Sequence, residues 1–332
     1  MFGSNAKNKN FIDGYLYPAN AQMEMGKIHS KSAGFYALLA TIIIWSTPAL
    51  FQYWLHDYFD VWTQNFYRYL AAIAVILPMA WRSLKRESSG LTLKNSIRCL
   101  FPAIPNASHQ IFQTLGVVAL LPGLYSIIGR SCVIFTAIFA MILFADERWI
   151  LRSSKFLTGM IICLTGSVLI VLFKDGDLGT FNITGFSYAM MAILSWASYG
   201  VLLKKSPAAL SAPVMFVLVA IFTALLLLPL MLMFGDPGAI LTAPPFAVFI
   251  LVLSGALCIG VGHALWIVSI RELGATFSQS LQLLCPIVAI YLSHLLFQES
   301  INFTQGIAAA AIIAGSLLVL RAKPPLREVE PE

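Results

Sequence analysis

Apolar runs of about 20 residues recur along most of the chain, separated by short polar links. Their edges are good to a few residues, and they occupy about 33–54, 61–81, 99–121, 123–145, 155–173, 183–203, 212–234, 246–270, 274–297 and 302–320. A helical run of this length matches the thickness of a bilayer's hydrocarbon core. Strands of a membrane barrel would instead alternate apolar and polar residues over about ten positions, which this sequence does not do. The sequence therefore predicts an all-α integral membrane protein with ten transmembrane helices.

The composition supports this prediction. Hydrophobic residues make up 59% of the 332 residues and charged residues only 11%, whereas soluble domains carry about 25% charged residues. An ordinary soluble enzyme and a disordered protein are therefore excluded. The net charge of +6 would indicate nucleic-acid binding in a soluble protein, but in a membrane protein it mainly marks the cytoplasmic side. We expect the lipid bilayer as a partner and no nucleic acid.

Lysine and arginine residues fall in alternate links. If the N-terminus is cytoplasmic, the cytoplasmic segments hold 18 of the 21 basic residues, and the opposite side holds only Lys174. The remaining two, Arg68 and Arg130, lie within apolar runs. Cytoplasmic loops of membrane proteins carry an excess of Lys and Arg. The count predicts a multi-pass protein of the cell membrane, with a polar N-terminal segment (1–32) and a tail (321–332) that are both cytoplasmic.

The two halves of the chain resemble each other at a nearly constant offset. Matching residues recur about 150 positions later: Trp45 and Trp196, Gly123 and Gly274, Glu147 and Glu299, and the small-residue pairs Gly159/Gly166 and Ala308/Gly315. Because five helices are an odd number, the second copy must lie upside down in the membrane. Such inverted repeats are typical of secondary transporters with a central site. We predict one five-helix repeat over 33–173 and a second over 183–320.

Several motifs are similar to those of a known transporter family. They lie between Leu273 and Leu320, and around Tyr67-Arg68-Tyr69-Leu70 in the first half; the matching positions are Trp45, Arg68, Ala137, Glu147, Gly166, Pro286, Glu299, Gly306 and Gly315. Over roughly 33–320 the chain resembles the EamA repeats of the drug/metabolite transporter superfamily. The resemblance implies a ten-helix transporter with two pseudo-symmetric halves that moves small metabolites, often amino acids or related solutes. In one departure, the family's helix-4 proline falls at Ile134, so a proline kink is expected only at Pro286.

Charged residues inside the apolar runs limit the substrate class. None of the 15 acidic residues falls in the middle of a run, and lipophilic-cation exporters need a membrane carboxylate, so a cation antiporter is disfavoured. Arg130 lies roughly 10 Å deep, at about 1.5 Å per residue. An arginine near mid-bilayer costs at least about 2.5–3.5 kcal/mol and normally faces a protein cavity. It either clamps an anionic group of the substrate or, alternatively, neutralises backbone carbonyls or snorkels outward.

We interpret the two arginines within the apolar runs differently. The residue that matches Arg130 in the second repeat is Gln282, which is also polar, and Ser126 matches Ser278 one turn earlier. The partner of Arg68, near the middle of helix 2, is expected to be a helix-end carboxylate, backbone carbonyls or a substrate, and we favour a structural role. The two arginines therefore suggest one functional and one structural position.

Helix 3 carries four polar residues at helical spacing: Asn106, His109, Gln110 and Gln113. The spacing predicts that they share one face, which lines either a cavity or a helix contact. His263 and His294, in later runs, are interpreted as hydrogen-bonding helix contacts rather than proton sites. Trp45 and Trp196 lie several residues inside their runs, away from the interfacial belt, and with Tyr199 and Tyr291 they either stack on a ligand or pack. The predicted substrate-binding residues are Arg130, His109, Asn106, Gln113, Gln282, Trp45, Trp196 and Tyr199.

The sequence contains no nucleotide-binding or hydrolase motif. We therefore expect no enzyme, no catalytic residues, no metal and no cofactor, and interpret the five cysteines as reduced packing residues. The predicted function is a secondary transmembrane transporter of a small polar metabolite, anionic or zwitterionic and amino-acid-like, acting by alternating access. The alternatives are a nucleotide-sugar or phosphorylated-sugar carrier, which would use Arg130 and Arg68 together, and a non-transporting membrane enzyme or receptor. Assembly into a homodimer stays open.

The predicted orientation can be tested by cysteine labelling. In a cysteine-free background, Gly90→Cys places a thiol in the basic 82–98 link, which we expect on the cytoplasmic side because of its Lys and Arg residues. An impermeant maleimide should label this variant only after the cells are opened. A cysteine in the 235–245 link is the matched control and should react on intact cells. Labelling of position 90 on intact cells would refute the orientation.

Overall fold

A computed structural model describes residues 31–144, 153–173, 182–203, 210–273 and 281–322. Within these ranges all regular secondary structure is helical. The first half contains α2 (Lys31–Trp45), α3 (Pro48–Leu55), α4 (Val61–Arg86), η1 (Ser88–Gly90), α5 (Leu93–Arg98), α6 (Leu100–Leu120), α7 (Pro122–Ile128), η2 (Gly129–Ser131), α8 (Cys132–Leu143) and α9 (Ser154–Leu172). The second half contains α10 (Ile183–Leu203), α11 (Ala212–Phe234), α12 (Ala239–Thr242), α13 (Pro245–Ser254), η4 (Gly255–Val261), α14 (Gly262–Leu273), η5 (Gln282–Leu284), α16 (Cys285–Phe297) and α17 (Phe303–Leu320).

Helices follow the apolar runs, as the sequence predicts. Among the described residues, six helices are long and apolar enough to cross a membrane: Ser32–Leu55, Pro122–Leu143, Ile183–Leu203, Pro213–Phe234, Pro245–Ser269 and Phe303–Leu320. Two shorter apolar helices cover Ser154–Ile170 and Gln282–Phe297. The protein is therefore a multi-pass, all-helical membrane protein. The ten-span arrangement and the repeat stay predictions.

Several of these helices are interrupted. A 3₁₀ turn, η2, separates α7 from α8, and a second one, η5, precedes α16. A π-helical segment, η4, joins α13 to α14. The first break was not expected from the sequence, because Ile134 replaces the proline. Gly129 and Ser131 lie in that turn, and a glycine with a neighbouring serine is a known site of helix bending.

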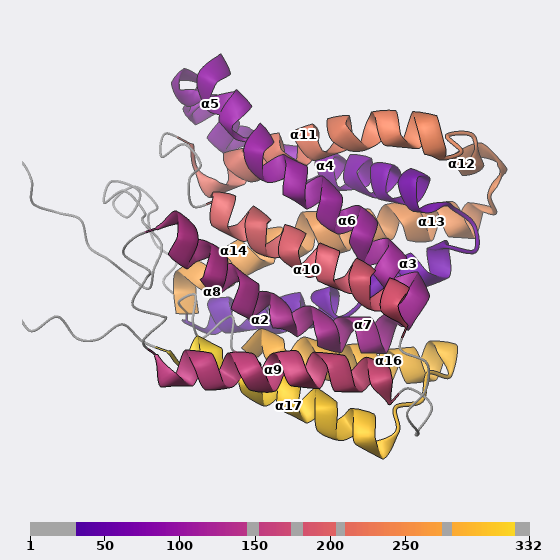
Figure 1. Cartoon of the computed structure of the whole chain (residues 1–332). Coiled ribbons are helices and arrows are strands. Elements are labelled where there is room, and N and C mark those ends of the chain that lie inside the picture. The colour runs from indigo at the N-terminus through magenta and orange to yellow at the C-terminus, as the bar shows by residue number, and fades with distance from the viewer. Residues whose placement is uncertain (1–30, 145–152, 174–181, 204–209, 274–280, 323–332) are drawn as a thin grey trace, which may run out of the picture.

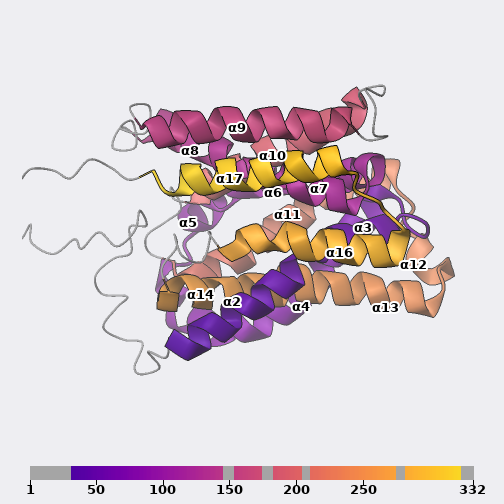
Figure 2. The ribbon, with the colours of Figure 1, turned by 90° about the horizontal axis from the view of Figure 1, so that it is seen from below.

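The helices run roughly along one direction, so their links gather at two ends of the bundle (Figure 1). α4 packs against α11 at one edge, and α9 packs against α17 at the opposite edge. Between them, α6 packs on α10, α2 on α14, and α7 on α16, and the view from below shows α16 next to α2 and α17 (Figure 2). The basic α5 and the short α12 lie at opposite ends of the bundle.

Small residues let α9 and α17 approach closely. A Cβ atom on Gly159 would lie 2.6 Å from the Gly315 carbonyl oxygen, and one on Gly315 would lie 2.7 Å from the Gly159 oxygen. At the other crossing point, a Cβ atom on Gly166 would lie 3.0 Å from the Ala308 oxygen. Backbones in membranes often pack through such small residues. The four small residues that the sequence pairs within each repeat therefore meet across the two helices.

Carboxylates tie α4 to α11 at both ends. Asp60 accepts from the backbone N–H of Asp236 at 2.9 Å, and Glu87 accepts from the backbone N–H of Ser211 at 2.7 Å. Asp60 also caps α4, accepting from the backbone N–H of Thr63 at 2.9 Å and from its hydroxyl at 2.6 Å. Burial raises the pKa of Asp60, but the hydrogen bonds from Thr63, Asp236 and Trp62 outweigh it and hold the pKa below its ordinary value.

Replacing Asp60 should destabilise the protein. Asp60→Ala leaves the donors at the start of α4 without their acceptor, which we expect to cost about 1–2 kcal/mol and to lower the melting temperature in detergent. Because the folded-state pKa lies below the ordinary value, this contribution is fully present above the ordinary carboxyl pKa. This contribution is lost as the pH falls through the folded-state pKa. The difference in melting temperature between wild type and Asp60→Ala should therefore become smaller in acid.

The exposed Asp57 in the same link supplies the control, since Asp57→Ala changes the same charge without the cap. Equal melting temperatures for the two alanine variants near neutral pH would contradict the proposed capping role.

Candidate functional site

Two interrupted helices meet at Arg130. This arginine lies in η2, and its Nη1 donates to the backbone carbonyl of Gln282, the first residue of η5, at 3.4 Å. The Arg130 carbonyl in turn accepts from the Ser316 hydroxyl in α17 at 3.4 Å. The next residue, Ser131, shares a 2.6 Å hydrogen bond with Ser167 in α9. The structure therefore brings Arg130 and its predicted counterpart Gln282 together.

Each of these two residues carries a polar side-chain atom without a hydrogen-bond partner in the described part of the chain. Arg130 Nε and Gln282 Nε2 are buried donors that find no acceptor among the described residues. Buried polar groups are nearly always hydrogen-bonded, so each unpaired donor carries a cost. A carboxylate offers two acceptor oxygens with a negative charge, and its hydrogen bonds to an arginine are among the strongest in proteins. Chemically, this pair is suited to an anionic acceptor group.

A cluster of rings lies on five other helices. We call it the aromatic cluster, and its members are Trp45, His109, Trp196, Tyr199, Phe216 and His263. Trp196 lies 4.8 Å from His109, 5.3 Å from Tyr199 and 6.4 Å from His263, measured between ring centroids. His263 in turn lies 5.1 Å from Trp45 and stacks on Phe216 at 4.5 Å. The cluster therefore joins the two tryptophans that match between the predicted repeats.

Sequence reasoning found four members of this cluster and missed two. His263 was interpreted as a helix contact, and Phe216 was not singled out. Nothing in the local sequence distinguishes Phe216 from the many other phenylalanines, because its role depends on the ring that stacks on it. For His263 the signal was its isolation in an apolar run, which could equally mean packing.

Both histidines of the cluster are held by backbone carbonyls. His109 Nδ1 lies 2.9 Å from the carbonyl oxygen of Ala192 in α10, and His263 Nδ1 lies 2.8 Å from that of Ile259 in η4. Because a carbonyl can only accept, each Nδ1 must carry the hydrogen. These bonds fix the tautomer and the orientation of both rings.

The π-helical segment η4 is packed closely on both sides. Trp45 Nε1 donates to the carbonyl oxygen of Cys258 at 3.0 Å, which fixes the indole ring. Arg68 is only 1% exposed, and its Nε donates to the Ser254 hydroxyl at 3.1 Å. A methyl group on Gly255 would overlap the Arg68 backbone carbonyl. These contacts place Arg68 at the junction of α4 with α13 and η4, as a structural role would require.

The polar residues of α6 point in different directions. His109 reaches α10, whereas the buried Asn106 donates to the Tyr69 hydroxyl at 2.7 Å and to the Thr223 hydroxyl at 3.0 Å. Asn106 therefore lies at the junction of α4, α6 and α11 rather than in the aromatic cluster. Gln113, which lies one turn after His109 on α6, is half-buried. The substrate-binding roles of Asn106 and Gln113 stay predictions.

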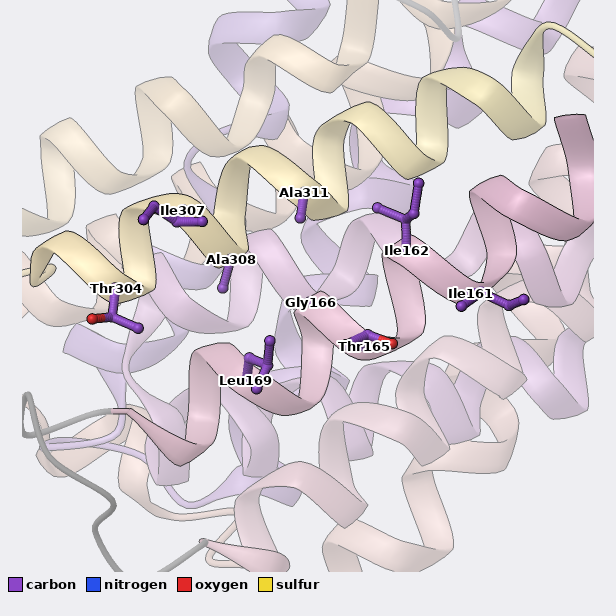
Figure 3. A pocket seen from close by; sticks show the side chains of 9 residues that line it. All are labelled: Ile161, Ile162, Thr165, Gly166, Leu169, Thr304, Ile307, Ala308 and Ala311. Atoms are coloured by element: carbon purple, nitrogen blue, oxygen red, sulfur yellow. The ribbon is translucent and has the colours of Figure 1, made fainter.

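The structure also has a groove of about 380 Å³ between α9 and α17 (Figure 3). Figure 3 shows Ile161, Leu169 and Ile307 around the close approach at Gly166. All the lining residues are uncharged, and most are aliphatic. The groove belongs to the seam between these two helices, apart from Arg130 and the aromatic cluster.

The second half of the chain matches a known protein family. Residues 183–321 match the model of the EamA-like transporter family. The chain carries an EamA-like transporter family domain. It includes Trp196, Tyr199, Phe216, His263 and Gln282, and so more than half of the residues assembled above.

Two of the similar proteins are named as transporters, and a third is named as WAT1-related. An uncharacterized transporter of Haemophilus influenzae is 28% identical over 60% of this chain and 66% of its own length. One of Clostridium kluyveri is 25% identical over 86% of this chain and 92% of its own. A WAT1-related protein of Arabidopsis thaliana is 26% identical over 81% of this chain and 80% of its own. The match to the EamA-like transporter family and the two transporter names support a membrane transporter of some substrate.

A solved structure shares the fold. A crystal structure with 15% sequence identity covers 87% of this chain and 96% of its own, with a TM-score of 0.58. The likeness to this solved structure is one of fold, and it extends beyond residues 183–321 into the first half of the chain.

The tight packing at η4 generates a prediction. Gly255→Ala should lower the melting temperature and the yield of monodisperse protein, because the added methyl group would overlap the Arg68 carbonyl; overpacking of this kind costs about 1–3 kcal/mol. Gly260→Ala, in the same segment, is the matched control, because its nearest neighbours would lie 3.5 Å away. Size-exclusion chromatography and thermal unfolding in detergent measure both effects. If Gly255→Ala matches Gly260→Ala in stability, this description of η4 is wrong.

Proposed function

We propose that this EamA-like protein is a secondary transporter of a small polar metabolite with an anionic or zwitterionic, amino-acid-like group. The observation that carries the proposal is the meeting of Arg130 and Gln282, which present two buried donors without acceptors. A substrate carboxylate would supply the missing acceptor. The arginine would then hold the negative charge, and the adjacent glutamine amide would fix its orientation.

The aromatic cluster supplies the second half of the proposed site. Trp45 packs in one hydrophobic cluster with Leu281 and Cys285, which lie on either side of the η5 turn that begins at Gln282. The aromatic cluster therefore adjoins the anion-binding pair through Trp45. The faces of Trp45 and Trp196 attract an ammonium group by cation–π interaction and also pack against an apolar side chain. A zwitterion would use both parts of the site at once.

Alternating access rests on the proposed inverted repeat of five helices. In such a repeat, the counterpart of the α6–α10 contact is a contact of α14 with α2, and both contacts are present. The pairs α4–α11, α7–α16 and α9–α17 each join a helix to its own counterpart. Two matching residues can touch only near the axis that relates the repeats, so the Arg130–Gln282 contact favours a site on that axis. Transporters with inverted repeats bind their substrates at this position.

The alternative of a sugar-phosphate carrier requires Arg68 and Arg130 to act together. Arg68 packs against α13 and η4 and is held by Ser254, whereas Arg130 packs against η5 and α17. The two arginines therefore make different helix contacts, and our proposal assigns the substrate anion to Arg130 alone, although Arg68 Nη1 also finds no acceptor among the described residues. Placement in the cell membrane with both termini in the cytoplasm remains part of the proposal.

Substitution of Arg130 tests the substrate class. We expect Arg130→Ala to lower uptake of radiolabelled L-amino acids into proteoliposomes by about 10–100-fold, which corresponds to the loss of a charged hydrogen bond of about 1.5–3 kcal/mol. Arg130→Lys keeps the charge but loses the two-pronged geometry, so it should raise KM with less effect on kcat.

The exposed Arg82 supplies the control, because Arg82→Ala removes a positive charge of the same chain outside the site. All variants should give the same yield of monodisperse protein. Wild-type uptake by a well-folded Arg130→Ala would show that Arg130 does not bind the substrate.

A further inference from the structure

The buried carboxylate of Glu299, just after the C-terminal end of α16, contacts the start of α7. Glu299 is only 6% exposed, and its Oε2 and Oε1 accept from the backbone N–H groups of Gly123 and Leu124 at 2.8 and 3.0 Å. The Ser293 hydroxyl also donates to Oε2. The first N–H groups of a helix have no partner inside the helix, and the helix dipole favours a negative charge there. A single side chain from α16's end therefore satisfies two backbone donors of α7.

The backbone on both sides of this contact is strained. Among the described residues, two non-glycine residues have positive φ: Leu121 at 74° and Gln298 at 55°. Leu121 lies two positions before Gly123, and Gln298 immediately precedes Glu299. Side chains disfavour these conformations, which persist only where surrounding contacts enforce them and which gather at functional sites. The strain is thus located at the two partners of the carboxylate contact.

The position of Gly123 leaves no room for a side chain. A Cβ atom there would lie 2.8 Å from Glu299 Oε2, so the carboxylate reaches the backbone only because the residue is glycine. The contact fixes both the height and the rotation of α7, because two neighbouring N–H groups share one carboxylate. α7 ends at Ile128, and Arg130 follows in η2.

The same two segments touch a second time at the proposed site. Glu299, after α16, holds the start of α7, and Arg130, after α7, donates to the carbonyl of Gln282, before α16. In both contacts a charged side chain of one segment binds the backbone of the other. A shift of α7 at its start would therefore move Arg130 relative to Gln282.

We propose that Glu299 is a positioning residue for Arg130. It holds α7 in the height and rotation that place the guanidinium against the η5 turn, and it makes no contact with substrate itself. This inference rests on the proposed function, because it deepens the role assigned to Arg130. Glu299→Gln keeps one acceptor oxygen but loses the charge and the second acceptor, so α7 should loosen without losing its helix.

Hydrogen exchange tests the contact without any substrate. In the purified full-length chain, Glu299→Gln should raise deuterium uptake in the 121–131 segment, because the Gly123 and Leu124 amides lose a charged acceptor. Glu87→Gln is the matched control, since Glu87 also accepts from a backbone N–H, that of Ser211, at a different helix junction. Uptake in 121–131 that is unchanged in Glu299→Gln, or raised equally in Glu87→Gln, would overturn the positioning role.

Transport kinetics test whether the effect passes through Arg130. Glu299→Gln should raise KM for amino-acid uptake about tenfold in the wild-type background and by less than threefold in Arg130→Lys, whose geometry is already lost. Glu87→Gln should change KM equally in both backgrounds. Equal effects of Glu299→Gln in both backgrounds would leave a structural contact only and overturn the proposal. If uptake of amino acids is absent even in wild type, the proposed substrate fails, and the exchange result alone decides whether Glu299 holds α7.

Discussion

Every backbone polar group inside a bilayer must find its hydrogen bond within the protein, and this constraint explains how the interrupted helices are held. Each interruption or helix end frees carbonyl or N–H groups that lipid cannot satisfy. Side chains from other helices reach several of them: Trp45 bonds the carbonyl of Cys258, Arg130 that of Gln282, and Gln305 that of Ile170. Glu299 does the same for two N–H groups of α7. The breaks therefore also connect the two halves of the chain.

The interrupted helices also bring polar and aromatic side chains of the candidate site together. The η2 and η5 turns bring Arg130 and Gln282 together, and one side-chain donor of each finds no acceptor among the described residues. Trp45 of the aromatic cluster shares a hydrophobic cluster with Leu281 and Cys285, which flank η5, and the two histidines are oriented by carbonyls of α10 and η4. The zwitterionic substrate that we propose would use the donors of Arg130 and Gln282 together with the aromatic faces, and the match to the EamA-like family supports a transport function.

The helical stretches could be predicted because a bilayer imposes one length and one polarity on whatever crosses it. Arg130 could be singled out for the same reason, since a charge in that position is costly and needs a purpose. The repeat offset matched Gln282 to Arg130, but only the tertiary structure showed that the two residues touch. The break at η2 could not be predicted, because Ile134 stands where the family has a proline. A turn at Gly129 and Ser131 depends instead on what packs around it. Phe216 could not be singled out from the sequence either, because its role depends on the ring of His263 that stacks on it.

The polar residues of α6 show where sequence information ends. Helical spacing put Asn106 and His109 on one side of the helix, and this much follows from the chain alone. Whether a residue on that side meets a cavity or another helix depends on which helices pack there, and the neighbours of α6 come from both halves. Asn106 meets hydroxyls of α4 and α11, while His109 meets a carbonyl of α10. The length of a helix and the cost of burying its polar residues are local properties that a sequence encodes directly. The partners of these α6 residues lie 37, 83 and 117 positions away along the chain, so only the tertiary structure decides them.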